Sequence, residues 1–333
     1  MAFSPNPFMV SSLILCLCTL ISLGSSYSIH QSCDRFRADV RAAADEAIRM
    51  AKHAKFRADL QNPPAGEIVD TLIGTPNGLQ SFKRYMERVP KEVGEHSRGP
   101  QIGAILIKCG DRHLIESSYR PGDYLDFDWP RMRPTSNIYG TRFCSGDHLA
   151  ITYETGQENP RAVVLLCETP SGDLKFHEVA IVENWNDAAV EGIEVDLLED
   201  FMSVTLLHEF LHGIDGDQFP AELAPGVPEA YGVHDIKTLT SAQKMKNADS
   251  YALLAGGLYY RLRPLDKNGV FQRPYEKGRE PPKGPHPEDS VLWIRNSDDE
   301  EDSDADFNAN RRARTKAETI AHGKPEMSNI IQV

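Results

Sequence analysis

The segment from Val195 to Gly213 has the sequence VDLLEDFMSVTLLHEFLHG. Its apolar residues recur at helical spacing, which predicts a helix over 195–213. Within that helix His208 and His212 are four residues apart, so both imidazoles project from one face. Gly213 follows directly and is a natural helix end.

These two histidines and the adjacent Glu209 have the HExxH spacing of a hydrolytic zinc site. Histidine nitrogens bind Zn²⁺ at about 2.0–2.1 Å, and Glu209 has the reach to serve a water that the metal activates. Glu209 would then take the proton of the attacking water and return it to the leaving amine. Two histidines that share a helix face by accident are the alternative, which the apolar helix around the motif disfavours. We therefore expect one Zn²⁺ per chain.

A catalytic zinc ion usually takes three protein ligands, so a third ligand is needed. Acidic and imidazole side chains that follow the helix are the candidates. They are Asp215, Asp217, Glu229, His234 and Asp235. Spacing alone does not choose among them.

Two further stretches, PGVPEAYG at 225–232 and NADSYA at 247–252, resemble motifs of the deuterolysin, or aspzincin, family of fungal zinc metalloendopeptidases. In that family HExxH is followed by Gly-Thr-x-Asp-x-x-Tyr-Gly and then by an Asn-Ala-Asp-Ser-Tyr-like helix. The resemblance covers roughly 33–263 and is sharp over 206–255. It implies an α+β zincin fold with N-terminal helices, a small mixed or antiparallel sheet, an active-site helix and a supporting helix. A cleft would lie between the two last helices, and an edge strand, Ala162 to Glu168, would pair with extended substrate.

The resemblance also implies roles for single residues. Tyr231 matches the family tyrosine, whose hydroxyl is thought to stabilise the oxyanion of the tetrahedral intermediate. The family's aspartate ligand corresponds to Pro228 here, but a one-residue deletion would bring Glu229 onto that position. A glutamate binds zinc as well as an aspartate does, and its longer stem would make up for a shorter loop. We expect Glu229 as the third ligand, with Asp235 and Asp217 behind it.

Asp249 matches an acidic position that, in lysine-specific relatives, helps to receive a lysine side chain of the substrate. The second acid expected three residues later is Ala252 here, so lysine preference is in doubt. Asp249 is therefore expected to bind substrate, while a role in orienting a zinc-binding histidine stays open.

The N-terminus predicts secretion. Phe8 to Leu23 is an apolar run followed by the small residues GSSYS at 24–28, the layout of a signal peptide over residues 1–28 with its cut near Ser26 or Ser28. Four cysteines then remain in an oxidising compartment, where an even count indicates two disulfides with three possible pairings. We favour Cys144–Cys167, which would join neighbouring strands, and Cys33–Cys109, which would tie down the first helix.

Elsewhere the hydrophobic pattern predicts helices over 33–60 and 78–89 and a last helix from after Thr240 to about Leu262, opened by a capping box with Gln243. Strands are expected over 102–107, 148–155, 162–168 and 177–182, and a loop over 213–228. The metallopeptidase domain would span 29–265. Residues 266–333, rich in proline, glycine and charge, are expected to form a disordered tail.

The net charge of -13 argues against nucleic acid and anionic membrane surfaces as partners. We therefore expect a secreted, extracellular monomer that acts on protein or peptide substrates, with no membrane contact after signal removal. A catalytically impaired zincin-fold binding protein, such as an adhesin or host-interaction factor, is the main alternative, because the third-ligand motif is altered. A zinc-scavenging protein is a further one.

Overall fold

The computed structural model describes the chain in ten ranges, and every structural statement below concerns these residues. They are 27–59, 66–74, 77–94, 105–116, 124–126, 143–144, 148–155, 161–176, 191–259 and 264–273. The expected apolar signal segment, the strand at 177–182 and the tail from residue 274 onward lie outside them.

The helical elements and strands alternate irregularly along the chain. The helical elements are η1 (Gln31–Phe36), α2 (Arg37–Asp59), α3 (Gly66–Ile73), α4 (Gly78–Val89), η2 (Pro90–Gly94), η5 (Val195–Asp200), α5 (Met202–Ile214), α6 (Gly232–Ile236), α7 (Ser241–Lys244) and α8 (Ala248–Tyr259). The strands are β1 (Ser28–Ile29), β2 (Leu106–Cys109), β3 (Leu114–Glu116), β4 (Tyr124–Asp126), β5 (Ala150–Thr155), β6 (Arg161–Leu166), β7 (Glu222–Ala224) and β8 (Val227–Pro228). The fold is mixed α+β, with several helices and a small sheet, as expected.

The main sheet has the order β1-β2-β6-β5. β1, β2 and β6 run parallel, whereas β5 runs antiparallel to β6. The sheet is therefore mixed, and among the described strands β5 lies at an edge. The expectation that residues 162–168 form the edge was wrong, because β6 lies between β2 and β5 and uses both of its sides for pairing.

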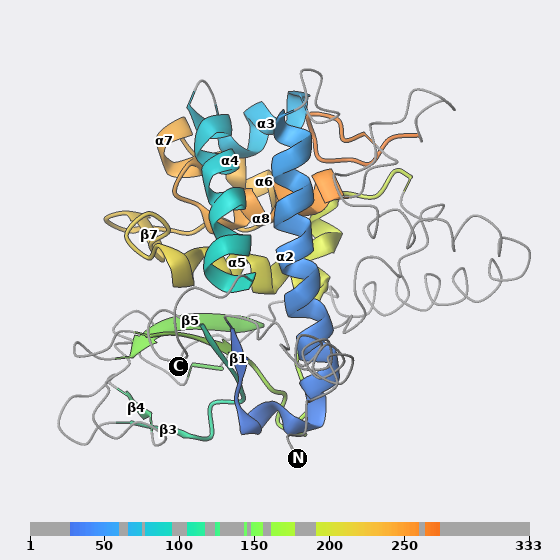
Figure 1. Ribbon diagram of the computed structural model, residues 1–333. Helices are drawn as coiled ribbons and strands as arrows, with labels where there is room; N and C mark the ends of the chain where they lie inside the picture. The colour runs from blue at the N-terminus through green and yellow to red at the C-terminus, as the bar shows by residue number, and fades with distance from the viewer. Residues whose placement is uncertain are drawn as a thin grey trace, which may run out of the picture. The chain divides into compact units, whose positions relative to one another are not determined.

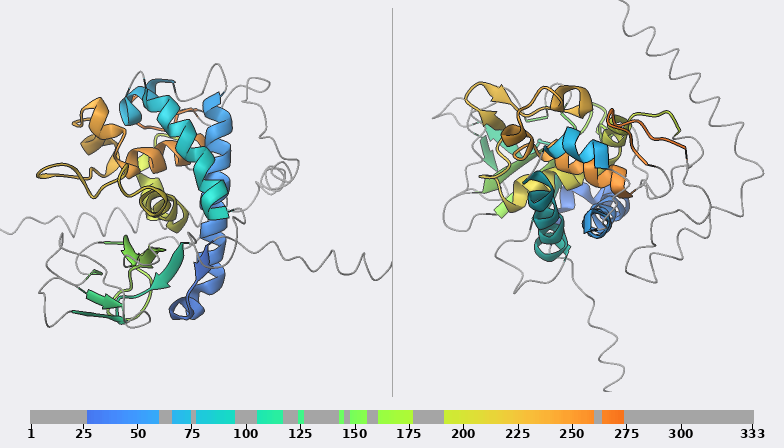
Figure 2. Two further views of the ribbon diagram at one scale, coloured as in Figure 1. Left: turned by 60° about the vertical axis from the view of Figure 1, so that its left-hand side comes forward. Right: turned by 90° about the horizontal axis from the view of Figure 1, so that it is seen from above.

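The two faces of this sheet bury different clusters, as the alternation of a β-strand requires. Ile107 of β2 and Val164 of β6 face the helices and belong to the larger core. Their neighbours Leu106 and Val163 face the opposite way, into a smaller core under β3 and β4. Figures 1 and 2 show the helices gathered over one face of the sheet and the β3–β4 hairpin on the other side.

Helix α5 lies between the sheet and the other helices and contacts α2, α4, α8, β5 and β6 (Figure 1). It does not begin at Val195 as expected. Residues 195–200 form a 3-10 turn, and Phe201 has extended backbone before α5 starts. The helix continues past Gly213 to Ile214, so this glycine does not end it. A Cβ on Gly213 would lie 3.0 Å from Ile105 and 3.2 Å from Ala162, so the glycine lets the helix approach the sheet closely.

The long helix α2 stands against α4, α5 and α8. Its buried side is rich in alanine, a small residue with high helix propensity, so neighbouring helices approach it closely. The predicted disulfides are both present. Cys33–Cys109 joins the turn before α2 to the end of β2, and Cys144–Cys167 joins the segment after β6 to the second cluster.

The expected last helix is divided in two. Thr240 and Gln243 form the predicted capping box, but α7 ends at Lys244 and α8 begins at Ala248. Asn247, between them, uses its side-chain amide to bind both backbone groups of Ala230, at 2.9 and 3.0 Å. This contact competes with continuation of the helix and ties the start of α8 to the loop before α6.

Both expected domain boundaries cut into packed residues. Tyr27 is buried and donates a hydrogen bond to Asp45, so a signal cut after Ser26 keeps it, whereas one after Ser28 removes it. Phe271, expected in the tail, is fully buried, and its backbone pairs with Ile193 and Leu265. Residues 264–273 therefore belong to the folded unit. No helix among the described ranges is both long and apolar enough to cross a membrane.

An ion pair in the smaller core provides a test of this fold. Lys108 of β2 and Asp126 of β4 are fully buried, with Nζ at 2.8 and 2.9 Å from the two carboxylate oxygens. Asp126→Ala leaves a buried ammonium without its carboxylate, and it should lower the free energy of unfolding by about 3–5 kcal/mol. The double variant Lys108→Met/Asp126→Leu should recover most of that loss. Guanidinium denaturation with the disulfides intact measures both, and a cost below about 1 kcal/mol for the single variant would contradict the pairing.

Candidate metal centre

Helix α5 presents His208 and His212 on one face, as their spacing predicts. Their Nε2 atoms lie 3.1 Å apart. His208 is buried, and His212 is partly buried. The two Nε2 nitrogens are therefore directed at one point beside the helix.

The third group at this point is Glu229, which follows the β7–β8 hairpin. Gly226, with φ of 75°, makes the turn of that hairpin, a conformation that favours glycine. The Glu229 carboxylate oxygen Oε2 lies 3.4 Å from His208 Nε2 and 3.2 Å from His212 Nε2. The residues expected to form a loop over 213–228 therefore include a short hairpin that brings this carboxylate to the histidines.

The three donor atoms form a triangle with sides of 3.1, 3.2 and 3.4 Å. Ligands about 2.05 Å from a tetrahedral ion are separated by about 3.3–3.4 Å, so the spacing matches three corners of such a site. His208, His212 and Glu229 could therefore hold a metal ion. Two imidazoles and one carboxylate suit Zn²⁺ and also other first-row divalent ions.

The competing third-ligand candidates lie elsewhere. Asp215 bonds Tyr85 at 2.7 Å and Arg88 at 2.6 Å, where it fixes the end of α5. The other three candidates are exposed, and none joins the group at the histidines. They are Asp217, His234 and Asp235. Glu229 is thus the only one of the five sequence candidates that meets both histidines.

Glu229 is held from behind by the start of α8. Its Oε1 accepts hydrogen bonds from the backbone N–H of Ala248 at 2.7 Å and of Asp249 at 3.4 Å. Both N–H groups belong to the first turn of the helix, where unpaired donors and the helix dipole favour an anion. Burial raises the pKa of Glu229, but the charges and hydrogen bonds of His208 and His212 outweigh it and hold the pKa well below its usual range.

The histidine rings are oriented by their other nitrogens. His212 Nδ1 lies 2.7 Å from the carbonyl oxygen of Phe219, and His208 Nδ1 lies 3.5 Å from Asp249 Oδ1. Such contacts fix the tautomer that leaves Nε2 for a metal. No motif pointed to Phe219, because the contact uses its backbone alone.

Asp249, expected to bind substrate, is buried at the first turn of α8 and also lines the pocket described below. Its Oδ2 accepts a hydrogen bond from the backbone N–H of Gly232 at 3.0 Å. Both carboxylate oxygens therefore have protein contacts. This arrangement favours the second interpretation of Asp249, as a residue that orients His208.

Tyr231 is 54% exposed and stacks on the His208 ring, with the centroids 5.8 Å apart. Its hydroxyl lies 3.5 Å from Glu229 Oε2. The predicted oxyanion donor is therefore beside the candidate metal ligands, on the exposed rim of the site.

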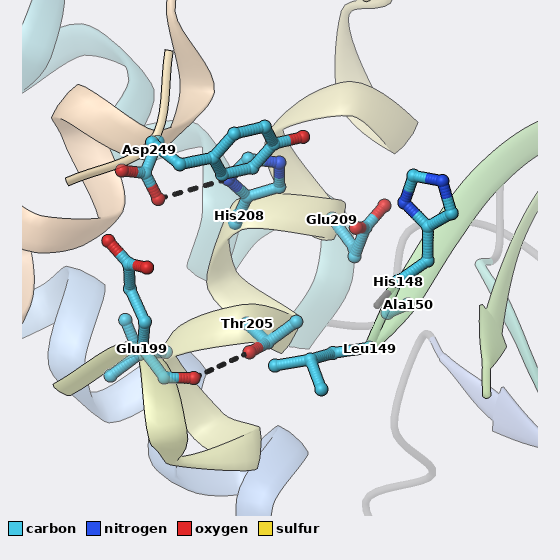
Figure 3. Close-up of a pocket in the computed structure, with 10 residues that line it drawn as sticks. His148, Leu149, Ala150, Glu199, Thr205, His208, Glu209 and Asp249 are labelled. Carbon is cyan, nitrogen blue, oxygen red and sulfur yellow. Dashed lines mark hydrogen bonds and ion pairs between the residues drawn. The ribbon is translucent and has the colours of Figure 1, made fainter. Parts of the chain in front are cut away.

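A pocket of about 340 Å³ opens next to His208, between α5 and the start of β5. Figure 3 shows Glu209 on the side of His148 and Ala150, with Glu199 and Asp249 on the other side of the pocket. The side chains of Leu149 and Val204 form an apolar part of the pocket wall. Glu209 projects into this pocket and is only slightly exposed, and its Oε2 accepts a hydrogen bond from Thr152 Oγ1 at 2.6 Å.

Glu199 is a pocket residue that sequence reasoning missed. Burial, together with the negative charges of Asp249 and Asp196, raises the pKa of Glu199 to about 9. An acid in the acidic run of 194–200 carries no sequence signal for such a raised pKa, since acids in such runs are ordinarily solvated.

No protein-family model matches the chain, and no curated protein matches it at a significant level. The assignment of the site therefore depends on its geometry.

The ligand set predicts the effect of single substitutions on metal binding. Glu229→Ala removes a direct ligand, so it should weaken Zn²⁺ binding by more than about 100-fold. Loss of a residue that only hydrogen-bonds a ligand weakens metal binding by up to about 100-fold. Asp217→Ala and Asp235→Ala are matched controls that remove exposed acids and should leave the affinity unchanged. Competition against a chromophoric chelator measures all three. Equal affinities for Glu229→Ala and the wild type would contradict the assignment.

Proposed function

We propose that the chain is a secreted, zinc-dependent endopeptidase of the zincin type that hydrolyses internal peptide bonds. The observation that carries the proposal is the convergence of His208, His212 and Glu229 beside a pocket into which Glu209 projects. A metal site of two histidines and one carboxylate with an adjacent glutamate is the combination that metal-assisted hydrolysis of peptides uses. When bound, zinc would act as a Lewis acid that activates water and polarises the scissile carbonyl.

Glu209 is the general base in this mechanism. It is the residue next to the ligand His208, and its carboxylate lines the pocket in which a substrate carbonyl and a water would meet. Glu209 accepts a proton from the attacking water and passes it to the nitrogen of the leaving amine. Tyr231, on the rim beside His208, donates a hydrogen bond to the developing oxyanion.

The substrate backbone would bind along β5. Within the part of the chain that the structure describes, this strand is an edge of the main sheet, and its first residue, Ala150, lines the pocket together with His148 and Leu149. An exposed strand edge offers unpaired N–H and C=O groups to an extended peptide. The edge is thus next to Glu209, which supports an endopeptidase that accepts extended protein segments.

Secretion is supported by the two disulfides, since such bonds persist in oxidising compartments. We further propose that the protein acts as a monomer on unfolded or flexible segments of extracellular proteins. Because Asp249 is engaged by His208 and Gly232, we do not propose a lysine preference.

Cleavage of unfolded casein tests this function. The zinc-loaded secreted chain should cleave casein at internal bonds, and a chelator should abolish the cleavage. Glu209→Gln should lower kcat by about 10²- to 10⁴-fold, the range that a general acid–base group contributes, while one Zn²⁺ per chain remains bound. A zinc-loaded wild type that does not turn over casein or a peptide library would contradict the proposal. That outcome would instead favour the zincin-fold binding protein.

A further inference from the structure

The carboxylate of Glu209 accepts a hydrogen bond from Thr152, a residue of β5. The Thr152 hydroxyl lies 2.6 Å from Glu209 Oε2 and 3.1 Å from the backbone carbonyl oxygen of the same residue. The Thr152 hydroxyl is the donor to Oε2. At 2.6 Å this is the shorter of its two contacts, within the usual range for a hydrogen bond from a hydroxyl to an oxygen. The single hydroxyl proton is therefore directed at the carboxylate.

The sheet determines that Thr152 faces Glu209. Ile151 and Tyr153, its neighbours on β5, face the smaller core on the far side of the sheet. Because successive side chains alternate, Thr152 points to the opposite face, where α5 contacts β5. Pairing of Thr152 with Val164 in β6 fixes this register.

The contact divides the roles of the two oxygens of Glu209. Oε2 is occupied by Thr152, and among the described residues Oε1 accepts no hydrogen bond. A carboxylate held by one oxygen cannot turn freely, so the other oxygen keeps one position over the pocket. Small displacements of such a group are costly, since a shift of about 1 Å in a reacting group can cost on the order of 100-fold in rate.

Resting on the function proposed above, we propose that Thr152 is the positioning residue for the general base. Its hydroxyl holds Oε2 of Glu209 and so presents Oε1 to the attacking water. Thr152 also belongs to the edge strand along which the substrate would pair. Its side chain points to a face of the sheet and its backbone runs along the edge, so the two interactions do not compete.

The test compares two substitutions at this position. Thr152→Val keeps the β-branched shape and removes the hydroxyl, whereas Thr152→Ser keeps the hydroxyl. Thr152→Val should lower kcat by about 10- to 100-fold with KM within about twofold, and Thr152→Ser should restore most of kcat. Thr238→Val is the matched control, because it removes an exposed hydroxyl that bonds the Asp235 carbonyl oxygen and does not touch the site.

A crystal structure of the zinc-loaded Thr152→Val variant gives a readout that is independent of turnover. The Glu209 carboxylate should leave its wild-type position or occupy more than one rotamer, while zinc and its ligands stay in place. Three outcomes would overturn the positioning role while leaving the endopeptidase intact. They are a Glu209 carboxylate that keeps its wild-type position in Thr152→Val, a kcat that Thr152→Val does not change, and an equal loss of kcat in Thr152→Val and Thr152→Ser. If the zinc-loaded wild type shows no turnover, the proposed function is overturned, and the role of Thr152 with it.

Discussion

The carboxylate of Glu229 is the contact on which the rest of the site depends. One of its oxygens faces the two histidines of α5, and the other accepts N–H groups from the first turn of α8. A buried carboxylate is costly unless charge and hydrogen bonds compensate it, and both are present here. The interaction joins the loop after the hairpin to α5 and α8, which also contact each other through His208 and Asp249. Without it, the Nε2 atoms of the buried His208 and the partly buried His212 would face each other without the Glu229 carboxylate beside them.

The surrounding fold supplies the rigidity that this contact needs. Asn247 interrupts the helix predicted after Thr240 and binds both backbone groups of Ala230, the residue next to Glu229. The break thus frees the N–H groups at the start of α8 and anchors the loop that carries the ligand. On the other side, the close approach of α5 to the sheet at Gly213 brings β5 within reach of Glu209.

Much of this arrangement could be predicted from the chain itself. The four-residue spacing of His208 and His212 was sufficient to place both on one helix face, and local capping chemistry predicted the start of α7. The even number of cysteines, together with the oxidising compartment expected for a secreted chain, was sufficient to predict two disulfides. Glu229 could be expected only through the resemblance, because its distance from the histidines depends on a hairpin whose turn had no clear strand pattern around it.

The remainder depends on tertiary contacts. The edge strand was misassigned because periodicity identifies strands and not their order in a sheet. Phe271 and Tyr27 were assigned to a tail and a signal, since a single buried side chain in a polar stretch carries little periodic signal. Thr152 and Glu199 have ordinary sequence surroundings, and only the packing of β5 and η5 against α5 brings Thr152 to Glu209 and Glu199 to the pocket.

The most direct test of the proposed metal site is anomalous diffraction at the zinc edge from crystals of the purified, zinc-loaded protein. We expect one zinc peak per chain, about 2.0–2.2 Å from His208 Nε2, His212 Nε2 and a Glu229 carboxylate oxygen. A zinc peak elsewhere, or a zinc ion bound by the two histidines with Glu229 turned away, would contradict it.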